Sequence, residues 1–129
     1  MAIHITGVNM RPLLAGTALW VIGTLVFRLG GSSMIHPPSI VRTLPSYIVN
    51  FVLAGAMVRI AFPLLGLPRA SWPAAVTLFI LPTLILDAFS TAFFTDTFPN
   101  LPPAVAPTFG GLMLISAAGA VTSAWVFRH

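Results

Sequence analysis

The chain has 129 residues, of which 57% are hydrophobic and 6% are charged, and its net charge is +4. A soluble domain carries roughly 25% charged residues, so this composition excludes a protein with a fully water-covered surface. The arginines stand singly and form no basic patch, which argues against nucleic acid as a partner. The absence of cysteine excludes disulfides and thiol chemistry.

Four apolar segments are long enough to cross a bilayer. A helix needs about 20 mostly apolar residues to span a hydrocarbon core of about 30 Å. The sequence therefore predicts an all-α fold, a single bundle of four transmembrane helices over residues 1–129. We expect short loops, with an interfacial segment between the first two spans, which carries Met34 and Ile35. The predicted spans are residues 12–29, 45–65, 72–94 and 107–127.

Small residues recur within these spans and allow helix backbones to approach closely. We predict that Trp20, in the middle of the first span, packs in a protein interface rather than at a headgroup belt. Pro82 in the third span removes one backbone hydrogen bond and is expected to bend the helix. The residues predicted to pack helices together are Gly16, Gly23, Gly55, Ser116, Gly119, Ala120 and Ser123.

The distribution of arginine predicts an orientation. Four spans place both termini on one side, and that side carries four of the six arginines, whereas Arg28 and Arg42 lie opposite with Asp96. The positive-inside rule then predicts cytoplasmic termini. Arg59 lies roughly 9 Å deep by helical rise, within reach of phosphates or a backbone carbonyl. The predicted lipid and headgroup contacts are Arg59, Arg69, Arg128, Trp72 and Trp125.

Asp87 is the acidic residue that lies deep within a predicted span. From a rise of 1.5 Å per residue, Asp87 lies roughly 22 Å and Arg28 roughly 24 Å from the same membrane edge. A charge at the bilayer centre costs about 2.5 to 3.5 kcal/mol on insertion scales. We therefore predict an intramembrane pair of Asp87 with Arg28. Without such a partner the carboxyl would remain protonated, because desolvation disfavours the charged form.

No motif for catalysis or metal binding is present. The histidines, His4, His36 and His129, lie outside the predicted spans, so a haem or chlorophyll ligated at mid-membrane is not expected. No zinc-protease helix, phosphate loop or paired carboxylate site appears. We expect a protein without enzymatic activity, cofactor or metal.

Part of the chain resembles a known family. The residues that carry the resemblance are 86–89, Phe93 and Phe94, the Phe-Pro-Asn-Leu-Pro-Pro segment at 98–103, and Phe109 with Gly110, and the first span is weakly similar over residues 19–28. The chain is thereby similar to a family of small four-span bacterial membrane proteins that is a domain of unknown function. The resemblance implies four spans and a bacterial inner membrane, and it implies no activity. The apolar residues of segment 98–105 are expected to pack on one end of the bundle.

Two functions fit the sequence. The first is an accessory or structural subunit that packs against other membrane proteins or itself, an energy-converting complex being one such assembly. The alternative is a small proton-coupled transporter or exporter, a homo-oligomer with Asp87 as coupling site and Pro82 as hinge. A cavity that reaches Asp87 favours transport, whereas a dry pair with arginine favours the structural role.

Overall fold

The computed structural model describes residues 9–129, and His4 lies outside them. Within that range the chain folds into four long helices joined by short elements, and no strand is present. Each long helix is long and apolar enough to span a membrane. The long helices are α1 (Arg11–Gly30), α2 (Ile40–Leu64), α3 (Trp72–Ala92) and α5 (Ala106–Val126). The short elements are η1 (Gly31–Ser33), η2 (Arg69–Ser71), α4 (Phe94–Thr97) and η3 (Pro103–Val105).

The long helices begin and end within two residues of the predicted ranges, except at the start of α2. The sequence predicts that this helix begins at Pro45, but it begins at Ile40, after Ser39 in an extended conformation. The Thr43 amide donates to the Ser39 carbonyl at 2.6 Å, and the Ser39 amide donates to Thr43 Oγ1 at 3.0 Å. These bonds fix the first turn. Pro45 removes one backbone hydrogen bond without ending the helix.

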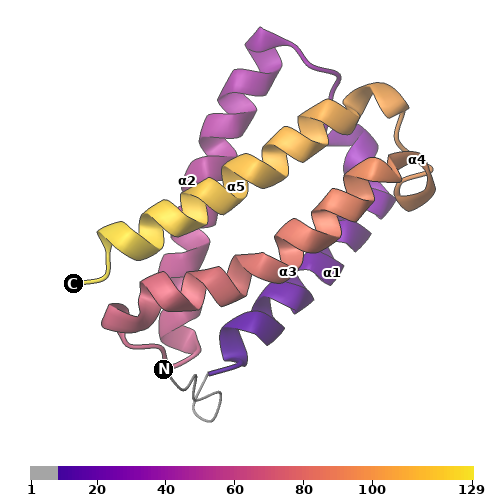
Figure 1. The fold of residues 1–129 in the computed structure, drawn as a ribbon. Helices are drawn as coiled ribbons and strands as arrows, with labels where there is room; N and C mark the ends of the chain where they lie inside the picture. The colour runs from indigo at the N-terminus through magenta and orange to yellow at the C-terminus, as the bar shows by residue number, and fades with distance from the viewer. Residues whose placement is uncertain (1–8) are drawn as a thin grey trace.

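The bundle is built from two helix pairs (Figure 1). α1 packs on α3, α2 packs on α5, and α3 packs on α5. α1 and α2 share no comparable interface. The start of α1 and the end of α5 lie at the same end of the bundle, which we call the terminal end. The opposite end, which holds α4, is the loop end.

Glycines set the distance within each helix pair. A Cβ on Gly16 would overlap the Phe79 carbonyl of α3, and a Cβ on Gly119 would overlap the Phe51 carbonyl of α2. Across the second pair, Ser123 Oγ donates to the Gly55 carbonyl at 2.8 Å, and Ala120 is buried beside it. These five residues are helix-packing residues, as the sequence predicts.

Two of the predicted packing residues have a different role. A Cβ on Gly23 would meet no atom within 4 Å, and both Gly23 and Ser116 line the central cavity described below. Their small size leaves space instead of bringing helices together. A contact that the sequence did not predict is that of Tyr47 with α5, where a Cβ on Gly111 would overlap Tyr47 Oη.

Apolar clusters close both ends of the bundle. The terminal cluster joins α2, α3 and α5 and consists of Val58, Phe62, Leu67, Trp72, Ala75, Val76, Phe79, Ala120 and Ala124. The loop cluster consists of Ile35, Phe94, Phe98, Leu101, Val105 and Phe109. The loop cluster includes the apolar residues of segment 98–105, which confirms that this segment packs on the bundle end. Asn100 Nδ2 also donates to the Phe27 carbonyl at 3.0 Å, at the end of α1.

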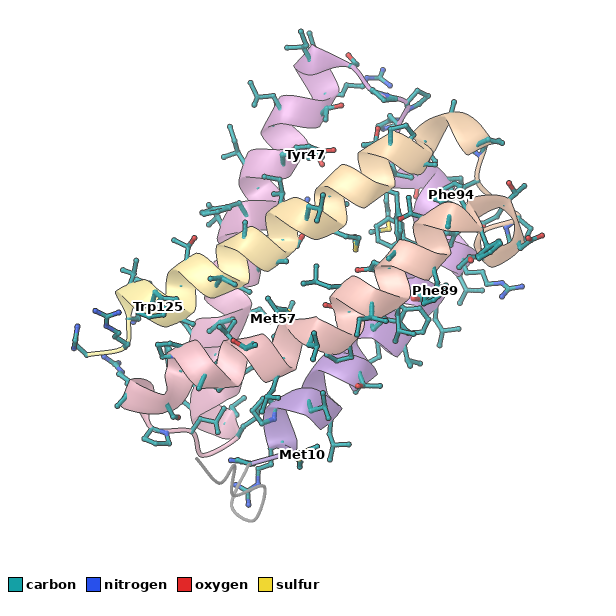
Figure 2. The ribbon with its side chains drawn as sticks, viewed as in Figure 1. Met10, Tyr47, Met57, Phe89, Phe94 and Trp125 are labelled. Atoms are coloured by element: carbon teal, nitrogen blue, oxygen red, sulfur yellow. The ribbon has the colours of Figure 1, made fainter. Side chains whose placement is uncertain are left out.

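The outer surface is apolar along all four long helices. Phe89 is 62% exposed and Trp125 is 53% exposed, and both point away from the bundle (Figure 2). Large aliphatic residues such as Ile48 and Val52 on α2 are similarly exposed. Such a surface suits hydrocarbon, and the fold is that of a multi-pass membrane protein.

The Gly119 contact predicts a stability difference between two glycine variants. Gly119→Ala should destabilise the bundle by about 1 to 3 kcal/mol, as overpacking typically does, because the methyl would overlap the Phe51 carbonyl. Gly23→Ala is the matched control, because its methyl would meet open space and alanine stabilises a helix by about 0.5 to 1 kcal/mol over glycine. Thermal unfolding of both variants in one detergent measures the difference. Equal stability would contradict the close approach of α2 and α5.

Candidate functional site

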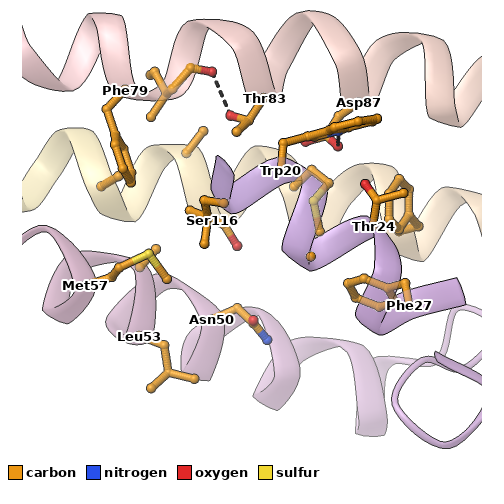
Figure 3. A pocket seen from close by; sticks show the side chains of 18 residues that line it. Trp20, Thr24, Phe27, Asn50, Leu53, Met57, Phe79, Thr83, Asp87 and Ser116 are labelled. Carbon is orange, nitrogen blue, oxygen red and sulfur yellow. Dashed lines mark hydrogen bonds between the residues drawn. The ribbon is translucent and has the colours of Figure 1, made fainter. Parts of the chain in front are cut away.

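A cavity of about 290 Å³ lies inside the bundle, between the terminal cluster and the loop cluster (Figure 3). All four long helices line it. Phe79 and Ala120 of the terminal cluster form part of its wall, and Phe109 of the loop cluster forms another part. Its volume is near the lower end of the range for ligand sites, roughly 300 to 1,000 Å³. The site is therefore suited to a small molecule.

The wall of this cavity is mostly apolar. Leu19 and Leu53 are typical of its aliphatic residues, and Trp20 and Phe27 are typical of its aromatic ones. A few convergent polar groups on an apolar wall are typical of a ligand pocket. The polar side chains that line it are Thr24 from α1, Asn50 from α2, Thr83 and Asp87 from α3, and Ser116 from α5.

Asp87 accepts a hydrogen bond from α1. Trp20 Nε1 donates to Asp87 Oδ1 at 3.0 Å, and the indole ring lies beside the carboxyl in Figure 3. Trp20 thus packs in the interface between α1 and α3, as predicted, and Asp87 is its hydrogen-bond partner there. The Trp20 indole is uncharged, so its hydrogen bond does not neutralise the negative charge of Asp87 when the carboxyl is deprotonated.

The predicted pair of Asp87 with Arg28 is wrong. Within residues 9–129, the hydrogen bond to the Asp87 carboxyl comes from Trp20, and the Arg28 side chain is exposed. The Gly16 contact with Phe79 sets the register of the parallel helices α1 and α3. Eight residues further along each helix, Thr24 is level with Asp87, so Arg28 lies one turn beyond it. Counting depth from the start of each span placed Arg28 and Asp87 at nearly the same level, because it assumed that α1 and α3 begin at the same depth.

Asp87 also borders a second hollow. A depression of about 420 Å³ lies on the outer side of the α3 and α5 interface, and Asp87, Thr91 and Gly110 are among its lining residues. Asp87 therefore borders both the central cavity and this outer depression. Thr91 Oγ1 donates to the Asp87 backbone carbonyl at 2.8 Å, and the hydrogen bond to the Asp87 side chain comes from Trp20.

The arginines at the terminal end contact other parts of the chain. Arg59 lies over the Phe127 ring at 4.2 Å, and Arg128 lies over Trp125 at 4.7 Å. Arg69 donates to the His129 carbonyl at 3.1 Å. All three arginines lie at the terminal end of the bundle. Headgroup contact by these arginines and by the exposed Trp125 stays a prediction.

Trp72 does not have the predicted role. It is 1% exposed and belongs to the terminal cluster, and its Nε1 donates to the Leu67 carbonyl at 3.2 Å. The prediction that Trp72 contacts headgroups is therefore wrong. Its position at the start of the third span resembles that of an interfacial anchor, but α3 turns that face toward α2.

Fold and site together define a class: a four-span membrane protein with one carboxyl in the wall of an internal cavity. Residues 41–129 match the model of the family of unknown function DUF5367, and the chain belongs to that family. The match covers α2 to α5, including Asp87 and the 98–103 segment, whereas Trp20 and the rest of α1 lie before it. No curated protein and no solved structure matches the chain.

The Trp20 hydrogen bond predicts energetic coupling between two residues. In a double-mutant cycle, Trp20→Phe and Asp87→Ala should be non-additive in stability by about 0.6 to 1.7 kcal/mol, the scale measured for interhelical hydrogen bonds in membranes. Arg28→Gln and Asp87→Ala should be additive within about 0.3 to 0.5 kcal/mol, as for groups without a shared contact. Unfolding of the variants in detergent gives both numbers. Coupling to Arg28 in place of Trp20 would restore the ion pair.

Proposed function

We propose that the protein is a small proton-coupled transporter of the bacterial inner membrane, in which Asp87 binds the coupling proton and the substrate in turn. The observation that supports this most is the position of the Asp87 carboxyl in a cavity wall, held by Trp20 and not by an arginine. Ionisable residues within a membrane are costly, and they typically mark substrate, ion or proton pathways. A dry pair of Asp87 with an arginine would instead have favoured a structural role.

The two apolar clusters give the cavity an occluded form. The terminal cluster separates it from one water phase and the loop cluster separates it from the other. Transport requires each cluster to open in turn. Pro82 lies five residues before Asp87 and cannot donate a backbone hydrogen bond to the preceding turn of α3. We assign the bending between the two halves of α3 to this position.

The setting of the protein follows from the same features. The excess of arginine at the terminal end supports cytoplasmic termini, and the family resemblance supports a bacterial inner membrane. A subunit of four helices is small for a transporter, so we propose that it works as a homo-oligomer in the lipid bilayer. The proposed role needs no catalytic residue, metal or cofactor.

A second candidate function is an accessory subunit of a larger membrane assembly. It is favoured by the missing interface between α1 and α2, which leaves room for a helix of a partner. The exposed apolar face of α2 would extend such an interface. This role predicts a cavity that excludes water, because partner side chains or lipid would fill it.

Single cysteines distinguish the two functions, because the chain has none of its own. Ser116→Cys and Thr83→Cys place a thiol on the cavity wall, and Leu25→Cys places one on a face of α1 that is 52% exposed. A charged methanethiosulfonate reacts with the thiolate, which forms where water is present. In liposomes, we expect both cavity cysteines to be modified and Leu25→Cys to remain unmodified, as measured by mass spectrometry of the intact protein.

Ala104→Cys, exposed between α4 and α5, serves as the fully reactive control. Cavity cysteines as unreactive as Leu25→Cys would overturn the transport proposal. That result would leave the accessory subunit as the better account.

A further inference from the structure

We propose that the substrate of this cavity is a small hydrophobic organic cation, such as a quaternary ammonium or protonated amine that carries an aromatic or aliphatic group. This inference rests on the proposed transport function and adds the chemical class of the substrate. Three features of the cavity support it: the charge of its one acid, the aromatic residues that line the same cavity, and the side on which the cavity is open.

The charge of the wall calls for a cation. Among the residues of 9–129 that line the cavity, Asp87 alone has an ionisable side chain. The described residues that line the outer depression also include no other ionisable group. Deprotonated Asp87 thus has one neutral donor, the Trp20 indole, and the described residues place no cation in either hollow. A cationic ligand would supply the missing charge, whereas an anion would be repelled.

The aromatic residues favour an organic cation over a metal ion. Trp20, Phe27, Phe79 and Phe109 all line the cavity, which places ring surfaces from α1, α3 and α5 around one space. Aromatic faces attract ammonium groups with about 0.5 to 2 kcal/mol each, the larger value applying where water is excluded. A metal ion would need several oxygen ligands, and Asp87 is the only carboxylate here.

The size and the opening of the cavity agree with a ligand that dissolves in lipid. A cavity of roughly 150 Å³ accommodates benzene, so about 290 Å³ admits one ring with a small ammonium group. On the α2 side, the lining residues Leu53 and Met57 are 58% and 38% exposed, and α1 and α2 share no interface comparable to those of the other helix pairs. That side faces the unpacked space between α1 and α2. A hydrophobic cation would enter from the bilayer by this route.

Competition at one carboxyl would couple the cation to the proton. The protonated carboxyl is neutral and offers the cation no charge. Where the free carboxyl is protonated, binding of the cation requires the proton to leave, so each cation bound then releases one proton to the medium. When the proton returns, it neutralises Asp87 and the cation dissociates. The exchange needs no other titratable group, in keeping with the composition of the cavity wall.

The test uses a matched pair of probes and the full-length protein in lipid nanodiscs. Benzyltrimethylammonium carries the charge, and neopentylbenzene is its neutral isostere with carbon in place of nitrogen. We expect the ammonium to bind at least about tenfold more tightly than the isostere, a difference of about 1.4 kcal/mol. Its affinity should fall as the pH is lowered, with one proton released per cation bound. Isothermal titration in buffers of different ionisation enthalpy measures both affinity and proton release.

Variants locate the effect. Asp87→Asn should reduce cation affinity at least about tenfold and abolish proton release, and Asp96→Asn is the control because that carboxyl is exposed on α4. Equal binding of both probes, or undiminished cation binding by Asp87→Asn, would overturn the cation inference. Absence of binding by either probe would also overturn it. In each case reactive cavity cysteines would leave the transport proposal intact, whereas unreactive ones would remove both.

Discussion

The hydrogen bond between Trp20 and Asp87 is the interaction on which the site depends. A carboxyl among hydrocarbon chains must find a donor, a cation or a proton, because the solvent supplies none. The indole of Trp20 provides that donor across the α1 and α3 interface, at 3.0 Å. Because this donor is neutral, it orients the carboxyl and leaves its charge to be matched by something else. The cavity provides the space in which a proton or a cationic ligand meets that charge.

Small residues provide the cavity as well as the packing. Gly16 and Gly119 bring each helix pair to backbone contact, and the bulky aromatic residues gather in the clusters at the two ends. Between those clusters, the small residues Gly23, Ala54 and Ser116 are among those that line the central cavity. A bundle that is tight within its pairs and closed at its ends thus has a hollow at mid-depth. The missing interface between α1 and α2 completes this arrangement, because the two helices that line this side of the hollow do not pack on each other.

The fold was largely predictable and the site only partly so. Long apolar runs predict the four helices because hydrocarbon thickness determines their length, and only α2 began at an unexpected residue, since Pro45 does not prevent an earlier turn anchored at Ser39. Asp87 was identifiable as the important acid from its depth alone. Its partner was not, because helix register depends on contacts such as Gly16 with Phe79 that no span boundary reveals. The observed register of α1 against α3 differs by three residues from the predicted one, and Arg28 therefore lies one turn beyond the Asp87 carboxyl.

The same limit explains the other errors. A small residue on a helix is equally suited to close packing and to lining a cavity, and the sequence does not distinguish Gly23 from Gly16. A tryptophan at a span end is equally suited to headgroups and to a core, and Trp72 is buried because α2 folds over it. The lone indole at mid-span was the available signal for the Asp87 partner, since a buried indole N–H usually finds a hydrogen-bond acceptor and Trp20 lies one turn before the level of Asp87 on a parallel helix.

The most direct test of this account is the carboxyl carbon spectrum of the protein labelled with ¹³C-aspartate. The chain has two aspartates and no glutamate, so two side-chain signals are expected. We expect the Asp87 signal to shift in Trp20→Phe, to be unchanged in Arg28→Gln, and to respond to the pH of the medium. An Asp87 signal that ignores both Trp20→Phe and pH, and moves instead with Arg28→Gln, would contradict it.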